Sequence, residues 1–116
     1  MDDRTAERLA ANEATFREAN ERIQERAREL EFEPPVPFLC ECGEPSCQTI
    51  VRLGLEAYEA VRRHEAWFIV VPEHEAVATA AGTVVERNDS YLVVEKTGRA
   101  GEVAAERDPR QPSARS

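Results

Sequence analysis

The chain has 116 residues and a formal net charge of −8 at pH 7, with 33% charged and 41% hydrophobic residues. This length predicts one small domain with flexible ends, and the negative charge disfavours partners with phosphate backbones or anionic lipid head groups. No stretch approaches the length of a membrane span, and MDDRTAERLA lacks the basic flank and apolar run of a secretory signal. We therefore expect a cytoplasmic protein that binds neither nucleic acid nor membrane.

Residues 4–31 are rich in Ala, Glu and Arg and contain no Gly or Pro, which predicts one helix of about seven turns. Leu9, Phe16, Ile23 and Leu30 recur every seven residues and form an apolar stripe. The stripe needs an apolar surface to cover. Packing on its own domain or pairing with a second copy is favoured over binding of a foreign partner.

The segment FLCECGEPSC, residues 38–47, holds all three cysteines of the chain, and we call it the cysteine knuckle. Pro34, Pro35 and Pro37 end the helix and favour an extended entry into the knuckle. The β-branched run 49–53 follows it, so the two flanking segments are predicted to pair as a hairpin with GEPS at its tip.

Clustered thiolates are the ligands that zinc selects. In an extended segment Cys40 and Cys42 point to the same face, and the turn after Gly43 folds Cys47 back toward them. Three thiolates can then meet one zinc ion at about 2.3 Å each. A redox or iron–sulfur site, or plain reduced cysteines, are the alternatives; an odd number of cysteines disfavours a disulfide framework.

A tetrahedral zinc ion needs a fourth ligand, and the chain has two histidines, His64 and His74. The predicted path favours His64, because the strand 49–53 leaves the knuckle and the helix after it brings the chain back. Both histidines stay candidates at this point.

The remaining segments predict a short helix from Leu55 to His64, a central strand WFIVV (67–71), a connection of low regularity, and a hairpin of TVVER and SYLVVE. Asn88 and Asp89 are expected to form its two-residue turn. The fold class is therefore α+β, with a small antiparallel or mixed sheet. We expect an N-terminal helix in residues 1–33, a zinc-knuckle domain in 34–97 and a mobile tail in 98–116.

The runs VPFLCECGEPSC, IVRLGLEAYEAVR, FIVVPEHE and SYLVVEK resemble a family of small uncharacterised actinobacterial proteins over about residues 12–108. In that pattern a proline, one residue and His-Glu follow the central strand, which corresponds here to Pro72, His74 and Glu75. The resemblance therefore implies that His74, and not His64, completes a site with Cys40, Cys42 and Cys47. It implies no reaction and no substrate.

A site with four protein ligands has no open position for catalysis. The predicted function is thus a non-enzymatic protein-interaction or regulatory module stabilised by zinc, with a protein partner or self-association. The alternative is a small metal-dependent or thiol redox enzyme that uses the cysteines. Glutamates near the site, Glu41, Glu44, Glu73 and Glu75, are expected to lie on the surface.

Overall fold

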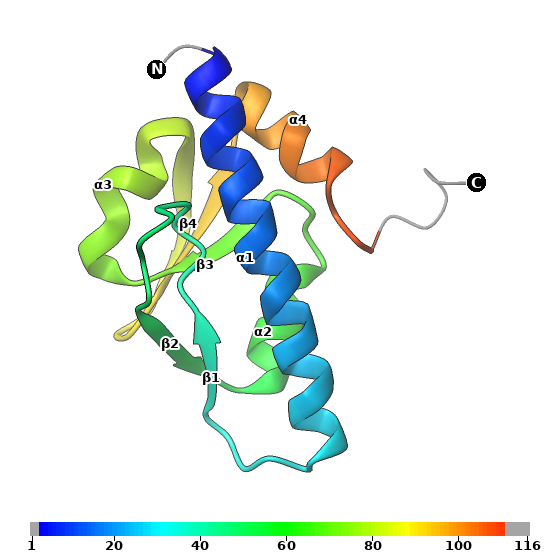
Figure 1. The fold of residues 1–116 in the computed structure, drawn as a ribbon. Helices are drawn as coiled ribbons and strands as arrows, with labels where there is room; N and C mark the ends of the chain where they lie inside the picture. The colour runs from blue at the N-terminus through cyan, green and yellow to red at the C-terminus, as the bar shows by residue number, and fades with distance from the viewer. Residues whose placement is uncertain (1–2, 111–116) are drawn as a thin grey trace.

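The predicted α+β class is confirmed by the structure, a computed structural model in which residues 3–110 are described. Figure 1 shows a long N-terminal helix beside two small groups of strands. The elements are α1 (Asp3–Glu29), β1 (Val36–Leu39), β2 (Ile50–Leu53), α2 (Leu55–Arg62), β3 (Trp67–Val70), η1 (Pro72–His74), α3 (Glu75–Ala78), η2 (Thr79–Ala81), β4 (Gly82–Arg87), β5 (Leu92–Lys96) and α4 (Gly98–Glu106). None of the helices in residues 3–110 contains an apolar stretch of the length that a membrane span requires.

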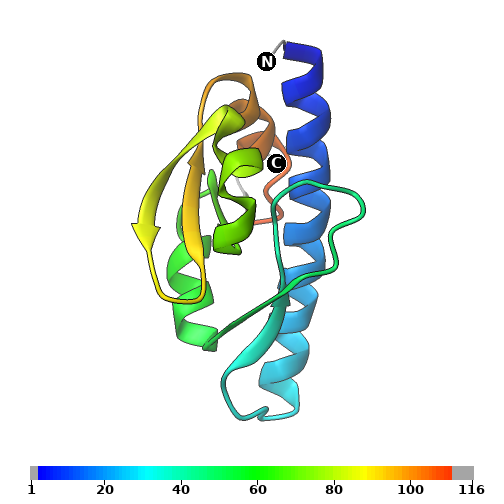
Figure 2. The same cartoon turned by 90° about the vertical axis from the view of Figure 1, so that its left-hand side faces the viewer.

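Two antiparallel sheets lie against α1. Strands β1 and β2 form the predicted hairpin, in which Val36 pairs with Leu53 and Leu39 with Ile50. The other sheet has the order β3-β5-β4; Figure 2 shows it to the left of α1, and Lys96 of its central strand pairs with Glu13 of α1. Ala27 of α1 belongs to the same buried core as residues of both sheets and of α2, so the helix is packed on the segment 34–97.

Helix α1 buries a different face from the one that its apolar stripe predicts. Phe16 and Ile23 are only half-buried, and Leu30 is 58% exposed. The buried positions follow a regular spacing of three and four residues and are mostly small or polar; they are Ala6, Ala10, Glu13, Ala14, Arg17, Asn20, Gln24 and Ala27. Partners inside the domain make this burial possible, which the periodicity of apolar residues cannot reveal.

Arg17 illustrates how a charged side chain is accommodated in this interface. It is fully buried, donates to the carbonyl of Glu65 at 2.6 Å and to the carbonyl of Ala104 at 2.8 Å. Its guanidinium lies 4.7 Å from the ring centroid of Phe68, a cation–π distance. Arg17 thus joins α1 to α4, to the loop after α2 and to β3.

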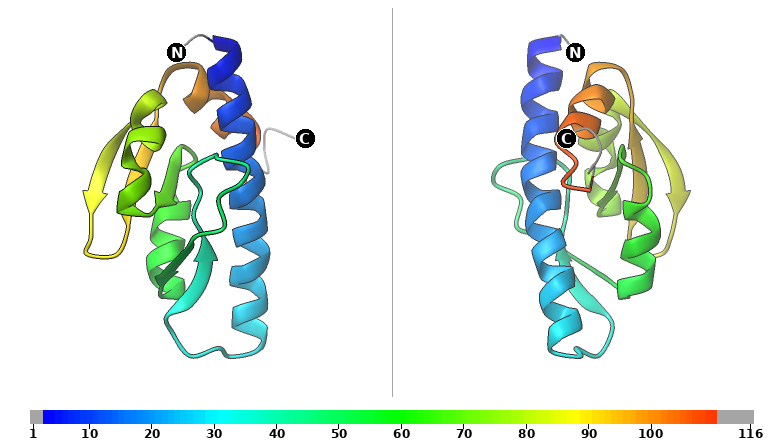
Figure 3. Two further views of the ribbon diagram at one scale, coloured as in Figure 1. Left: turned by 60° about the vertical axis from the view of Figure 1, so that its left-hand side comes forward. Right: turned by 90° about the vertical axis from the view of Figure 1, so that its right-hand side faces the viewer.

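The expected tail, 98–116, is not wholly a tail, because its first part forms α4. Ala100, Val103 and Ala104 are buried there, and Ala10 of α1 lies in the same small cluster. Figure 3 shows α4 beside the N-terminal half of α1. These residues are too small to form a recognisable apolar stripe, but their size lets the two helices approach closely. Residues 107–110 are also packed on the domain, since Asp108 is buried beside Arg62 and Arg110 pairs with Glu21 and Glu59. The last part of the expected tail, residues 111–116, lies outside the described residues.

The predicted two-residue turn at Asn88 and Asp89 is wrong. The ladder between β4 and β5 ends with Arg87 paired to Leu92, so four residues connect the strands, and the amide of Asn88 donates to the carbonyl of Tyr91 at 2.9 Å. The register shifts between Val84 and Glu86. This bulge adds one residue, Val85, to β4.

Candidate metal centre

The structure brings Cys40, Cys42, Cys47 and His74 together. One ligand atom from each residue lies within 4.8 Å of the other three. The Nδ1 atom of His74 is 3.6 Å from Cys40 Sγ and 3.7 Å from Cys47 Sγ. Residues from the knuckle and from η1, which are 27 or more positions apart in the chain, therefore face one point.

These distances fit a tetrahedral zinc ion. With Zn–S of about 2.3 Å and Zn–N of about 2.0 Å, tetrahedral angles place a ligating sulfur about 3.5 Å from a ligating nitrogen. The two distances from His74 Nδ1 to cysteine sulfurs, 3.6 and 3.7 Å, agree with this value within about 0.2 Å. Thiolates and imidazole are also the donors that zinc prefers.

Local backbone geometry positions the thiols. The amide of Cys40 donates to the carbonyl of Thr49 at 3.0 Å, which continues the β1–β2 hairpin into the knuckle. Gly43 then takes a positive φ of 89°, and the amide of Cys47 donates to the carbonyl of Glu44 at 2.9 Å. This turn returns Cys47 to the first two cysteines, as the Gly-containing sequence predicts.

His74 reaches the cluster because β3 ends at the knuckle. The amide of Val71, the residue after β3, donates to Cys40 Sγ at 3.4 Å. Pro72 then starts the short turn η1, and the amide of His74 donates to the carbonyl of Val71 at 3.0 Å. The Pro-x-His-Glu segment therefore places His74 one turn after Val71, the residue whose amide contacts Cys40 Sγ.

His64 is not part of the cluster. It is exposed and stacks on Trp67, with ring centroids 3.6 Å apart and an interplanar angle of 18°. Its neighbour Glu65 offers a carbonyl to Arg17 of α1. Helix α2 does turn the chain back, but its end lies at the junction of α1 and α4, which is why the path argument for His64 was wrong.

The three thiols have different electrostatic surroundings. Burial raises the pKa of Cys40 and of Cys42 above the ordinary value of a thiol. Burial also acts to raise the pKa of Cys47, but hydrogen bonds from the backbone and side chain of Thr49, together with those from Cys42 and Cys40, outweigh it and lower the pKa of this thiol. A bound dication would favour the thiolate of all three residues.

The expectation that Glu41 lies on the surface is wrong. Its side chain is fully buried, because in an extended Cys-Glu-Cys segment the middle residue points away from its neighbours and into the core. Burial raises the pKa of the Glu41 carboxyl, and hydrogen bonds from Asn20, Ile69 and Tyr58 oppose this shift. The alternation of side chains in the sequence was the signal that could have predicted this position.

The other nearby glutamates are at the surface, as expected, or nearly so. Glu44 and Glu73 are exposed. Glu75 is partly exposed and accepts two hydrogen bonds from Arg87, at 2.7 and 3.0 Å. This ion pair lowers the pKa of Glu75, so the carboxylate next to His74 is engaged with β4.

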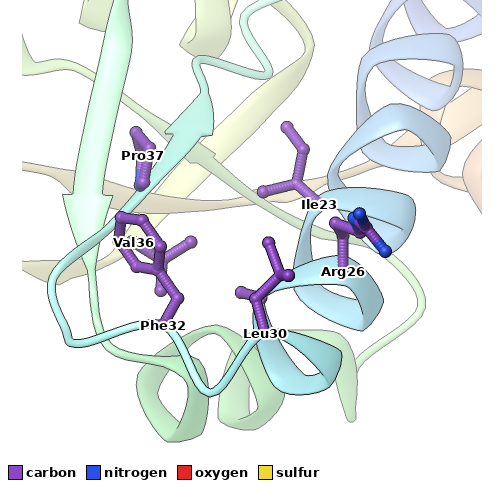
Figure 4. A pocket seen from close by; sticks show the side chains of 7 residues that line it. Ile23, Arg26, Leu30, Phe32, Val36 and Pro37 are labelled. Carbon is purple, nitrogen blue, oxygen red and sulfur yellow. The ribbon is translucent and has the colours of Figure 1, made fainter.

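A second surface feature lies at the C-terminal end of α1. An apolar hollow of about 190 Å³ is lined by Ile23, Arg26, Ala27, Leu30, Phe32, Val36 and Pro37, and Figure 4 shows the aliphatic and aromatic side chains around it. Leu30 and Phe32 are 58% and 46% exposed, the highest values among the large hydrophobic residues exposed in the described part of the chain. We refer to this feature as the apolar hollow.

No protein-family model, curated protein or solved structure matches this chain significantly. The features of this chain that bear on its function are the cysteine–histidine cluster and the apolar hollow.

Proposed function

We propose that this chain is a small cytoplasmic zinc-binding protein whose ion is structural, and that it acts as a non-enzymatic interaction or regulatory module. The observation that supports zinc is the pair of distances from His74 Nδ1 to the sulfurs of Cys40 and Cys47, 3.6 and 3.7 Å. The Pro72-x-His74-Glu75 segment also agrees with the actinobacterial family that the sequence resembles. Cys42 completes a Cys₃His ligand set.

The ligand set supports a structural ion. Four protein ligands fill a tetrahedral zinc ion and leave no position for a substrate or a reactive water. Among the nearby carboxylates, that of Glu41 faces the core and that of Glu75 is paired with Arg87. In a domain of this size, the free energy of zinc binding adds directly to the free energy of folding.

The apolar hollow supports a protein partner. We propose that it receives a bulky apolar side chain flanked by lysine or arginine residues on the partner. Residues 25–33 include four exposed glutamates, and their two arginines, Arg26 and Arg28, already lie in ion pairs with Glu29 and Glu59. The surplus of negative charge and the net charge of −8 favour a basic partner over a second copy of this chain.

A thiol enzyme is the second candidate, and Cys47 is the observation in its favour. Cys47 is the only one of the three thiols that is partly exposed, and its pKa is lowered, as in reactive cysteines. Zinc ligation would occupy this thiolate. Rapid alkylation of Cys47 by iodoacetamide in the zinc-loaded protein would support the enzyme; protection of Cys47 until a chelator is added supports the structural ion.

Metal analysis of the purified protein tests the proposed function. We expect one zinc ion per chain, loss of zinc and of thermal stability in Cys42→Ser, and the same loss in His74→Ala. His64→Ala is the matched control and should keep its zinc. Unchanged zinc content in Cys42→Ser would overturn the proposal, and loss of zinc in His64→Ala but not in His74→Ala would reverse the histidine assignment.

The proposed partner chemistry needs its own experiment. A peptide with a central Phe-Leu pair between arginines is titrated against the zinc-loaded protein, and a peptide with glutamates in place of the arginines is the control. We expect binding of the first peptide only, and its loss in Leu30→Asp. Equal binding of both peptides, or a dimer in sedimentation that Leu30→Asp dissociates, would contradict the basic partner.

A further inference from the structure

We propose that Glu41 is a positioning residue for the metal centre, which fastens the Cys40-Glu41-Cys42 segment to three other elements. This inference rests on the proposed function, since it concerns how the chain holds the cysteines ready for zinc. Glu41 is not one of the residues of the cluster. Its side chain points to the opposite side of the segment from the side chains of Cys40 and Cys42.

The first set of hydrogen bonds joins Glu41 to β3. The amide of Glu41 donates to the carbonyl of Ile69 at 2.8 Å, and one carboxylate oxygen, Oε1, accepts from the amide of Ile69 at 2.9 Å. Strand β3 is at an edge of its sheet. One residue of the knuckle thus satisfies both backbone groups of Ile69 on this edge, where an added strand would otherwise pair.

The second set of hydrogen bonds joins Glu41 to α1 and α2. The other carboxylate oxygen of Glu41, Oε2, accepts from Asn20 Nδ2 at 2.8 Å and from the hydroxyl of Tyr58 at 2.9 Å. Asn20 also binds both backbone groups of Leu39, at 2.7 and 2.9 Å. The residues directly before and after Cys40 are therefore both held by Asn20.

The groups that contact the Glu41 carboxylate, namely the Asn20 amide, the Tyr58 hydroxyl and the backbone amide of Ile69, are all hydrogen-bond donors. An acceptor-only group with these contacts has one orientation in the core, and the alternation of an extended chain then directs Cys40 and Cys42 together toward His74. Interactions outside the ligand set commonly change metal affinity by about 10- to 100-fold when they orient the ligands. Glu41 would contribute by restricting the two thiolates before zinc binds, so that they lose less conformational freedom on binding.

Glu41→Gln tests the inference with little change in volume. The amide of the new side chain would place N–H donors against at least one of the donors now bound. We expect the zinc dissociation constant, measured by competition with a chromophoric chelator, to rise about tenfold or more. The visible absorption of the cobalt(II)-substituted protein should change in intensity or position, because the ligand geometry is less fixed.

Two further variants make the result specific. Tyr58→Phe removes one donor to the carboxylate and should raise the zinc dissociation constant in the same direction but less. Val103→Ala is the control for a merely structural effect, because Val103 is buried in the separate cluster of α1 and α4. It should lower stability and leave the cobalt spectrum unchanged.

The outcomes separate the two proposals. Failure of the unaltered chain to bind zinc would overturn the proposed function and the role of Glu41 with it. Zinc binding by the unaltered chain, with the same affinity and cobalt spectrum in Glu41→Gln, would overturn the role of Glu41 alone. If Glu41→Gln does not fold, Tyr58→Phe decides, and a cobalt spectrum and affinity identical to those of the unaltered chain would overturn the inference.

Discussion

Glu13 of α1 and Lys96 of β5 form an ion pair in which neither side chain is exposed to solvent. Lys96 is the only lysine in the chain, and its Nζ also donates to the carbonyl of Ala78 at 2.7 Å. The pair joins the polar face of α1 to the central strand of the sheet. A buried charge whose partner is removed loses its compensation in a medium of low polarity.

Lys96→Met should therefore destabilise the fold by about 3 to 5 kcal/mol at about pH 8, where the Glu13 carboxyl is ionised. Replacement of both residues, Glu13→Leu with Lys96→Met, should recover most of this loss, since apolar substitutes of similar size need no partner. Urea unfolding at saturating zinc measures both variants. If Lys96→Met alone is as stable as the unaltered chain, the pair of Glu13 and Lys96 contributes nothing to stability.

The stability of the fold should also depend on pH through Glu13. Burial raises the pKa of its carboxyl from 4.5 to about 7, although Lys96 opposes the shift. Between these pH values the folded chain keeps a proton that the unfolded chain has released, so the contribution of Glu13 to stability falls as the pH rises. Above about pH 7 this contribution no longer changes.

Glu13→Gln isolates this effect, because protonation of the thiolates at low pH acts on both proteins. We expect the difference in unfolding free energy, unaltered chain minus Glu13→Gln, to fall from about pH 4.5 to about pH 7. Urea titrations at several pH values in that window provide the measurement. A difference that increases with pH would mean that the ion pair lowers the pKa of Glu13 instead.

The elements with apolar runs could be predicted from the sequence, and so could the cysteine turn. Trp67–Val70 forms the expected strand, and the spacing of Cys40, Cys42 and Cys47 gives the expected convergence. These features depend on local rules, namely the alternation of side chains in an extended segment and the positive φ of Gly43. The resemblance, and not the chain path, indicated His74.

The buried face of α1 could not be predicted in this way. Glu13, Arg17 and Asn20 look like a solvated face, and only their distant partners Lys96, Ala104 and Leu39 explain their burial. Periodicity reports which residues are apolar, and it contains no information on which polar groups find partners in the interior. The same limit applies to Glu41.

Gly43 should tolerate no side chain. Its φ is +89°, and a Cβ atom there would lie 2.6 Å from Leu9 Cδ1 and 2.8 Å from Glu13 Cγ. Gly43→Ala should cost about 1 to 3 kcal/mol from the backbone conformation alone and should weaken zinc binding. Thermal unfolding and chelator competition measure the two effects.

Gly54→Ala is the matched control for Gly43→Ala. Gly54 precedes α2 with a φ of −74°, and no atom outside Gly54 and its two chain neighbours lies within 4 Å of an added Cβ. The unfolding free energy of Gly54→Ala should differ from that of the unaltered chain by less than about 1 kcal/mol. Alanine lowers the entropy of the unfolded chain, and this offsets the weaker start of α2. Equal losses in the two variants would contradict the assignment of a special backbone role to Gly43.

The apolar stripe of α1 should contribute less than the core. Phe68 is fully buried beneath Arg17, and Phe68→Ala should cost about 3 to 5 kcal/mol. Phe16 is half-buried, so Phe16→Ala should cost less than about 2 kcal/mol, because less apolar area returns to water. Urea unfolding compares the two, and similar losses would show that Phe16 is as well covered as Phe68.

Zinc K-edge X-ray absorption of the metal-loaded protein tests the ligation by Cys40, Cys42, Cys47 and His74 most directly. The predicted spectrum has a first shell of three sulfur atoms at about 2.3 Å and one nitrogen atom at about 2.0 Å. His74→Ala should lose the imidazole contribution, and His64→Ala should retain it. A first shell with fewer than three sulfurs, or with an imidazole signal that persists in His74→Ala, would contradict the Cys₃His site.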